Sequence, residues 1–409
     1  MSLAASAPAP LPATGRRGIP PLPLLTLLNY FNYMDRQVVY GMTTQISDTF
    51  HLSQFQFGWL AFVNLFVFAV SSAISGPIAD RIGPRRVIFS GVVLWSAATI
   101  GSALSHSFSM LLVCRAIVGV GEGAYGPSAN ALLCADAPPE KRGRALGIYN
   151  VGMAFGATSG LVLGNALAPL MDWHTVFWIA GGPSVLLAAA AAFVAAPPRL
   201  ERATKLPARA YILAPTYLIA LGGAILSTFG ASALVVWSQK LIVVERGMKG
   251  MLGNVFMLFV GLVPGIAGVV VGGYMGDALT RRGGRGGHAR AIGLSLLAAI
   301  PFGVASLLVT NQLAFMVLTP ISVFLLSVYN GPAAAVIDEL GPPRYAATLQ
   351  ANVMFWAHVL GNAPAGSVVG WIADHSTVAL ALQTAVAAFG IAGVLFMITA
   401  RRQRVEKIS

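Results

Sequence analysis

Long apolar segments, separated by short connections that contain polar residues, glycine and proline, dominate this chain. Each segment is long enough to cross a bilayer, which takes about 20 apolar residues in a helix. Six lie in the first half, at 23–47, 54–79, 86–105, 108–136, 143–170 and 174–196. Six more follow at 211–242, 250–277, 290–309, 312–338, 345–373 and 377–400. The pattern predicts an all-α integral membrane protein with twelve transmembrane helices.

A polar connection divides these segments into two sets of six. Residues 197–210 contain three prolines and four basic side chains. We therefore predict an N-terminal bundle over 23–196, a cytoplasmic linker over 197–210 and a C-terminal bundle over 211–400. Residues 1–22, rich in alanine and proline, are expected to form a disordered N-terminus, and residues 401–409 a short tail.

Composition agrees with this fold class and fixes an expected orientation. The chain is 56% hydrophobic and only 10% charged, with a mean hydropathy of +0.74, so little is left for a soluble domain. A net charge of +12 would favour nucleic acid binding in a soluble protein. Here the basic residues gather in short loops on one side, which is the pattern of cytoplasmic loops. The sequence predicts a multi-pass protein of the plasma or inner membrane, with both termini cytoplasmic and no nucleic acid partner.

No motif of a known enzyme type is present. The sequence contains no Walker loop, no HExxH, no Gly-x-Ser-x-Gly and no cluster of cysteines and histidines. Cys114 and Cys134 fall on one predicted helix about 30 Å apart, so they cannot pair with each other. We expect a monomer with no enzymatic activity, no cofactor and no bound metal.

A pattern of glycine, aspartate and arginine at residues 76–86 returns in a looser form at 272–282. Each copy lies at the end of an apolar segment, and the spacing of about half the chain indicates two structural halves. The first copy resembles the signature loop of the major facilitator superfamily. The resemblance implies two pseudo-symmetric six-helix bundles around a central cavity, and loops that hold the cytoplasmic ends together in the outward-open state. The implied gating residues are Gly76, Asp80, Arg81, Gly83, Arg85, Asp277 and Arg281.

Four charged residues lie inside predicted spans, where a charge costs several kcal/mol and needs a reason. They are Asp35, Arg36, Arg115 and Glu122. Arg115 and Glu122 are two helical turns apart and share a face. One interpretation is a neutral structural cluster of two acids and two bases. The other assigns proton coupling to Asp35 and Glu122 and substrate binding to Arg36, Arg115 and Glu122, with Arg36 as the partner that competes for Asp35.

Aromatic residues and one histidine complete the candidate substrate site. Tyr33, Trp237, Phe355 and Trp356 are candidates for lining the cavity, although packing explains any single aromatic residue equally well. His358, in the eleventh segment, is a further candidate because imidazole titrates near neutral pH.

Four blocks resemble the spinster family of lysolipid and sphingolipid transporters. They are residues 28–36, 115–125, 228–237 and 358–364. The chain departs from the family pattern at His174, Gln239 and Asn362. The resemblance implies a secondary transporter for an amphipathic anionic or zwitterionic lipid, coupled to protons, with membrane lipids as its other partners. An organic-anion or sugar-acid symporter remains open, as does a non-transporting membrane sensor.

Overall fold

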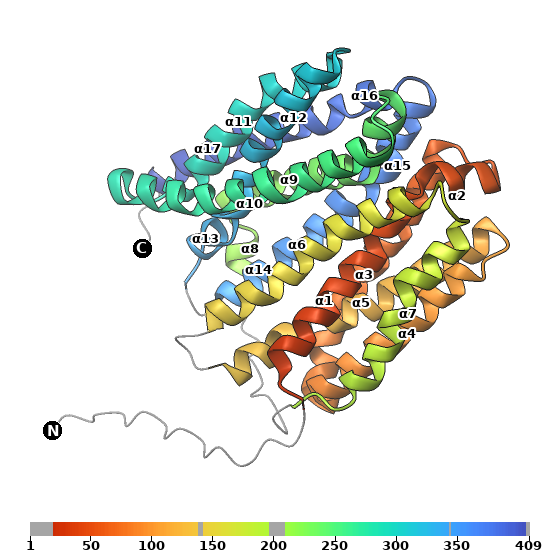
Figure 1. The fold of residues 1–409 in the computed structure, drawn as a ribbon. Helices are drawn as coiled ribbons and strands as arrows, with labels where there is room; N and C mark the ends of the chain where they lie inside the picture. The colour runs from red at the N-terminus through yellow and green to blue at the C-terminus, as the bar shows by residue number, and fades with distance from the viewer. Residues whose placement is uncertain (1–18, 138–141, 196–208, 343–344, 406–409) are drawn as a thin grey trace.

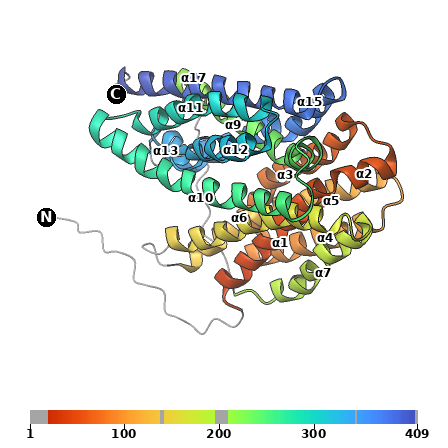
Figure 2. The same ribbon diagram turned by 45° about the horizontal axis from the view of Figure 1, so that its top comes forward.

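The computed structural model describes residues 19–137, 142–195, 209–342 and 345–405. Within these ranges every regular element is a helix, apart from one isolated bridge between Ile19 and Val194. We call residues 19–195 the N-half and residues 209–405 the C-half. The two halves lie side by side, and the helices of both run between the same two ends of the molecule (Figure 1; Figure 2).

The helices of the N-half follow the six predicted segments. They are α1 (Pro21–Gly41), α2 (Thr43–Phe50), α3 (Gln54–Ile82), α4 (Pro84–Ala103), α5 (Phe108–Asp136), α6 (Arg142–Leu167) and α7 (Trp173–Ala191). The first predicted segment is divided, since α2 is a separate short helix after Met42.

The C-half repeats this plan with more interruptions. Its elements are α8 (Arg209–Ile212), α9 (Pro215–Gln239), η2 (Lys240–Glu245), α10 (Gly250–Gly283), α11 (Gly287–Leu308), α12 (Gln312–Ser327), η3 (Val328–Asn330), α13 (Ala333–Asp338), α14 (Ala346–Trp356), η5 (Ala357–Asn362), α15 (Ala363–Asp374), α16 (Val378–Ala381) and α17 (Gln383–Val405). Both η2 and η5 are π-helical, a geometry found frequently at functional sites.

The helical spans match the predicted fold class. Among the described residues, ten helices are long and apolar enough to cross a membrane. The remaining two predicted spans are α1, which carries Asp35 and Arg36, and the consecutive elements α14, η5 and α15. The protein is therefore an integral, multi-pass membrane protein.

Two predicted boundaries need correction. Residues 19–22 were expected to be disordered, but α1 begins at Pro21, and Ile19 donates its N–H to Phe193 O at 2.8 Å. The N–H of Ala195 returns a bond to Ile19 O at 3.0 Å, which ties the start of α1 to the end of α7. The predicted linker also ends in helix, since α8 begins at Arg209. Residues 1–18 and 196–208 lie outside the described residues.

Five helices that begin at the same end of the molecule have a side-chain cap at their first turn. The capping residues are Ser53, Ser107, Asp172, Asn311 and Thr377. Each satisfies a backbone N–H that the first helical turn leaves without a partner. We call this the capped end. The opposite end, where α1 begins and α17 finishes, is the terminal end (Figure 1).

A row of glycines on α6 places α1 close beside it. Their positions are 152, 156, 160 and 164, as the sequence predicted for one small helix face. An added Cβ at these positions would collide with the backbone oxygens of Thr26, Tyr30, Met34 and Val38. Because glycine has no side chain, the two backbones pack directly against each other. This contact holds α1, the helix that carries Asp35 and Arg36.

Candidate functional site

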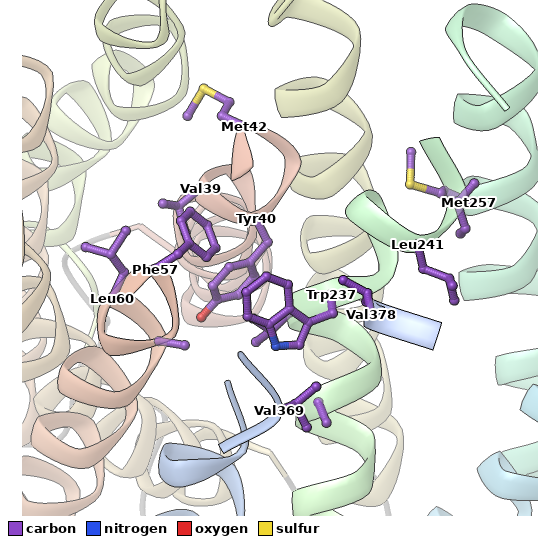
Figure 3. Packing of buried hydrophobic residues seen from close by; sticks show 14 of the residues in the cluster. Val39, Tyr40, Met42, Phe57, Leu60, Trp237, Leu241, Met257, Val369 and Val378 are labelled. Carbon is purple, nitrogen blue, oxygen red and sulfur yellow. The ribbon is translucent and has the colours of Figure 1, made fainter. Parts of the chain in front are cut away.

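An apolar cluster joins the two halves at the capped end. Phe57 and Tyr40 of the N-half surround Trp237 of the C-half, with Val369 beside them (Figure 3). The Phe57 and Trp237 ring centroids are 5.9 Å apart, and Trp237 Nε1 donates to Gly366 O at 3.1 Å. Trp237 is fully buried. It therefore does not line the cavity in this conformation, and its role in substrate binding stays a prediction.

Polar contacts between the halves reinforce this closure. The Asp374 carboxylate accepts the backbone N–H groups of Gln54 at 2.6 Å and Phe55 at 2.9 Å. An acid of the C-half thus caps the first turn of α3 in the N-half, where the helix dipole favours negative charge. Asn165 also donates to Asn254 at 2.6 Å and accepts from Gln239 at 3.2 Å. The capped end is closed.

A cavity of about 740 Å³ lies between the halves on the terminal side of this closure. Its N-half wall contains Asn29, Asn32, Tyr33, Phe68, Ala69, Ser72, Ala73, Gly76, Glu122, Tyr125, Gly126, Pro127, Asn130, Tyr149, Asn150 and Met153. Its C-half wall contains Ile212, Thr348, Ala351, Asn352, Met354, Phe355 and His358. The N-half wall is rich in amides and hydroxyls and holds a carboxylate, whereas the C-half wall is more apolar. Such a cavity suits an amphipathic ligand.

A buried ion pair lies at the wall of this cavity, and of its two partners Glu122 is a lining residue whereas Arg36 is not. Arg36 Nη2 donates to Glu122 Oε2 at 2.7 Å, and Arg36 Nε donates to the same oxygen at 3.0 Å. The guanidinium also lies over two cavity-lining rings, 4.8 Å from the Tyr33 centroid and 4.5 Å from the Phe68 centroid. Burial of both partners strengthens their attraction but makes either charge costly when left alone.

Asp35 and Arg115 lie behind this pair, inside the N-half. Ser184 Oγ donates to Asp35 Oδ2 at 3.2 Å, while Arg115 donates to Ser102 Oγ at 3.2 Å and to the backbone oxygen of Asp35 at 3.3 Å. Both charged side chains are buried, and neither is among the residues that line the cavity. The guanidinium of Arg115 lies 5.2 Å from the ring centroid of Phe177.

The structure corrects one predicted pairing within this cluster. Arg36 was expected to compete for Asp35, but its carboxylate partner is Glu122. Consecutive residues on a helix point about 100° apart, so Asp35 and Arg36 meet different neighbours. Asp35 is directed to α4, α5 and α7, and Arg36 to α3 and α5. The four charges still form one neighbourhood, divided into an ion pair at the cavity and two charges, Asp35 and Arg115, in the interior of the bundle.

Several buried polar atoms of the cluster have no hydrogen-bond partner among the described residues. They include Glu122 Oε1, Asn32 Nδ2, Asp35 Oδ1 and Arg115 Nε. Buried polar groups are nearly always satisfied, and exceptions ask for an explanation such as a ligand or a proton. Because Glu122 and Asn32 line the cavity, their unmatched atoms are available to a ligand that carries both a donor and an acceptor.

The remaining predicted substrate residues divide between cavity and surface. Tyr33, Phe355 and His358 line the cavity. The His358 ring lies 5.2 Å from Phe68, so Phe68 has Arg36 as one neighbour and His358 from the other half as another. Trp356 is 37% exposed and does not line the cavity, so its role in substrate binding stays a prediction. Of these two neighbours on α14, only Phe355 lines the cavity.

The predicted gating residues lie at the terminal end, at the two repeated loops. Gly76 lines the cavity, and Gly83 adopts φ +91°, a value that favours glycine, in the turn between α3 and α4. The Arg85 guanidinium donates to Ala192 O at the end of α7, within the N-half. Arg81, Asp277 and Arg281 are exposed, and Asp277 Oδ1 accepts a hydrogen bond from His288 Nε2 at 3.1 Å. The side chain of Asp80 lies outside the described residues, so the gating role stays a prediction.

Sequence reasoning missed the uncharged residues that shape the site. Phe68 carries no pattern that distinguishes it among the aromatic residues of its helix, and Ser102 and Ser184 resemble ordinary packing residues. The amides Asn29 and Asn32 offered a usable signal, because polar side chains one turn apart on α1 lie on the same face as Arg36. The Asp374 contact had no local signal, since its partners are backbone groups 320 and 319 residues away.

Comparison with known proteins agrees with this architecture. The sequence profile of the Major Facilitator Superfamily matches residues 25–362. An MFS-type efflux pump of Mycolicibacterium smegmatis is 27% identical over 372 residues, covering 88% of this chain and 86% of that protein. A probable sphingolipid transporter of Arabidopsis thaliana, spinster homolog 1, is 24% identical over 420 residues, covering 89% and 85% respectively.

A solved structure has the same fold. The crystal structure of a bacterial homolog of the human lysosomal transporter Spinster, in an inward-facing and occupied conformation, superposes with a TM-score of 0.81 at 22% identity. The match covers 95% of this chain and 98% of that one. The expected fold and the resemblance to spinster proteins are thereby confirmed.

Proposed function

This chain belongs to the major facilitator superfamily, and we propose that this membrane transporter moves an amphipathic anionic or zwitterionic lipid, such as a lysophospholipid or a sphingosine phosphate, by proton-coupled alternating access. The observation that carries the proposal is the cavity itself. A buried ion pair lies at its N-half wall, and a more apolar wall that includes Met354 and Phe355 faces it from the C-half. The plant relative named as a probable sphingolipid transporter supports the same substrate class.

The arrangement suggests how such a lipid would bind. The head group would lie against Arg36 and Glu122, with an ammonium or hydroxyl donor directed to Glu122 Oε1 and a phosphate directed to Arg36. The acyl chain would lie against Phe355, Met354 and the other apolar residues of the C-half wall. A charged group in a low-dielectric cavity gains most from a charge-assisted partner, so the head group would be oriented strongly.

A competition assay tests the substrate class. Purified protein reconstituted into proteoliposomes would be given a labelled lysophospholipid, and uptake would be measured against unlabelled lysolipids and short soluble carboxylates. We expect lysolipids to compete and the carboxylates not to compete. Competition by carboxylates alone would favour the organic-anion symporter, and the absence of any flux would favour the membrane sensor.

Asp35 is the proposed proton carrier, with Arg115 as its interior partner. Asp35→Asn removes the titratable group while keeping the bond from Ser184, so pH-gradient-driven accumulation should be lost and some substrate exchange should remain. Driven uptake and exchange would be measured in the same proteoliposomes. Full pH-driven uptake by the Asp35→Asn variant would contradict this role and would favour the interpretation of the four charges as a neutral structural cluster.

Both termini are proposed to be cytoplasmic, in a plasma or inner membrane, so the closed capped end would face away from the cytoplasm. Thr204→Cys, in the linker outside the described residues, should be protected in intact cells from a thiol reagent that cannot cross membranes. Ser109→Cys, exposed near the capped end, is the matched position that should react. Cys134 would be replaced by serine in both variants, since it is a partly accessible free thiol. Labelling of Thr204→Cys from outside would overturn this topology.

A further inference from the structure

Six exposed arginines gather at the terminal end of the C-half. They are Arg281, Arg282 and Arg285 at the end of α10 and in the loop after it, and Arg401, Arg402 and Arg404 in the last turns of α17. The two groups are more than 100 residues apart in the sequence. Neither group belongs to the cavity.

Contacts between the two helix ends make these arginines one surface. Gly286 packs against the backbone of Ala400, and a Cβ built on Gly283 would lie 3.0 Å from Arg404 Nη2. Gly284 and Gly286 have φ of +71° and +85°, which lets the chain turn tightly enough to lie on the end of α17. We call the six residues the C-half arginine surface.

The two acids beside this surface, Asp277 and Glu339, contact a histidine rather than the arginine side chains. His288 Nδ1 lies 2.5 Å from Glu339 Oε1, and its Nε2 lies 3.1 Å from Asp277 Oδ1. Arg285 reaches only the backbone oxygen of Glu339, at 3.2 Å. None of the six arginines forms an ion pair with another described residue. The surface therefore presents six guanidinium groups that form no ion pair with a described carboxylate.

The length of α10 places this charge at the membrane surface. The helix has 34 residues, whereas about 20 cross the hydrocarbon core, so its last turns extend beyond the core. Tyr274, 74% exposed and two turns before Arg281, suits the level of the lipid head groups, where tyrosine is enriched. The arginines after it then lie level with lipid phosphates or just beyond them.

We propose that the C-half arginine surface binds the phosphate groups of anionic phospholipids in the surrounding membrane leaflet. Guanidinium groups recognise phosphate in a two-pronged geometry, and clusters of four to eight basic residues beside a membrane span attract anionic lipids. This site is separate from the cavity and does not depend on the identity of the transported substrate.

Native mass spectrometry of the full-length protein tests the proposal. The detergent-solubilised protein would be titrated with phosphatidylglycerol, and with phosphatidylcholine as the uncharged comparison. We expect the first phosphatidylglycerol to bind in preference to phosphatidylcholine, and Arg401→Gln combined with Arg402→Gln to weaken that binding at least about fivefold. Both side chains are exposed, so the folded state should be retained, which size-exclusion chromatography would check.

A charge-matched control separates a local site from general attraction. Arg86→Gln combined with Arg144→Gln removes two exposed arginines from the terminal end of the N-half. This control should leave binding of the first phosphatidylglycerol unchanged. An equal loss in both double variants, no loss in either, or displacement of the lipid by inorganic phosphate at constant ionic strength would each overturn the proposal.

Discussion

Replacing Glu122 with glutamine should nearly abolish transport and should also destabilise the protein. The substitution leaves the Arg36 guanidinium buried without its carboxylate, at a cost of about 3–5 kcal/mol for a broken buried pair. The cavity would also lose the acceptor proposed to meet the substrate head group. Lysolipid flux in proteoliposomes and thermal unfolding of the purified protein measure the two effects.

A double variant separates the structural role of this pair from its role in transport. Arg36→Gln combined with Glu122→Gln removes both charges, so neither is left buried without the other and much of the lost stability should return. Transport should not return, because neither a guanidinium nor a carboxylate is left for the head group. Together with the two single variants, the double variant forms a double-mutant cycle, and its interaction free energy measures the coupling between Arg36 and Glu122. Wild-type flux in the double variant would mean that the pair serves structure alone.

Replacing Asp374 with alanine should open the capped end. The carboxylate accepts two backbone N–H groups from the first turn of α3, and hydrogen bonds to a charged group contribute about 1.5–3 kcal/mol each. Their loss should shift the equilibrium toward the open state by at least about tenfold, since 1.4 kcal/mol corresponds to a factor of ten. Spin labels at Ser109 and Gln312, exposed positions on the two halves, would report a longer distance in an otherwise cysteine-free protein.

Glu245 provides a matched control for this experiment. Its carboxylate also accepts two backbone N–H groups, from Val378 at 2.6 Å and Ala379 at 3.0 Å, but all three residues lie in the C-half. Glu245→Ala removes the same kind of cap without removing a contact between the halves, so the label distances should stay as in the parent protein. Unchanged distances in Asp374→Ala as well would show that the apolar cluster around Trp237 closes this end without help.

Much of the architecture could be predicted because membrane insertion depends on local sequence. Backbone polar groups in hydrocarbon must bond within their own segment, so each long apolar run became a helix near its expected bounds. The boundaries that failed, at residues 19–22 and 209–210, depend on contacts with distant segments. Ile19 is ordered because it bonds to the end of α7, and nothing near it in the sequence indicates that partner.

The candidate site could be predicted only in part. A charge in a span is conspicuous by itself, so Asp35, Arg36, Arg115 and Glu122 were all identifiable from the sequence. Their partners were not, since the partner depends on which helix packs beside each face. Trp237 shows the same limit: an aromatic residue suits a cavity wall or a closed interface equally, and only the arrangement of the halves decides between them.

By itself, the sequence determined the number and length of the spans, the division into halves, the family and the set of charges that a membrane does not tolerate without a reason. Each of these follows from local sequence features: the length of apolar runs, the placement of charges and short motifs. Tertiary structure decided that Arg36 pairs with Glu122, that Asp374 caps a helix of the other half, and that the arginines of α10 and α17 share one surface. It also decided which end is closed. That choice depends on a small free-energy difference between two arrangements of the same helices, and no local pattern records such a difference.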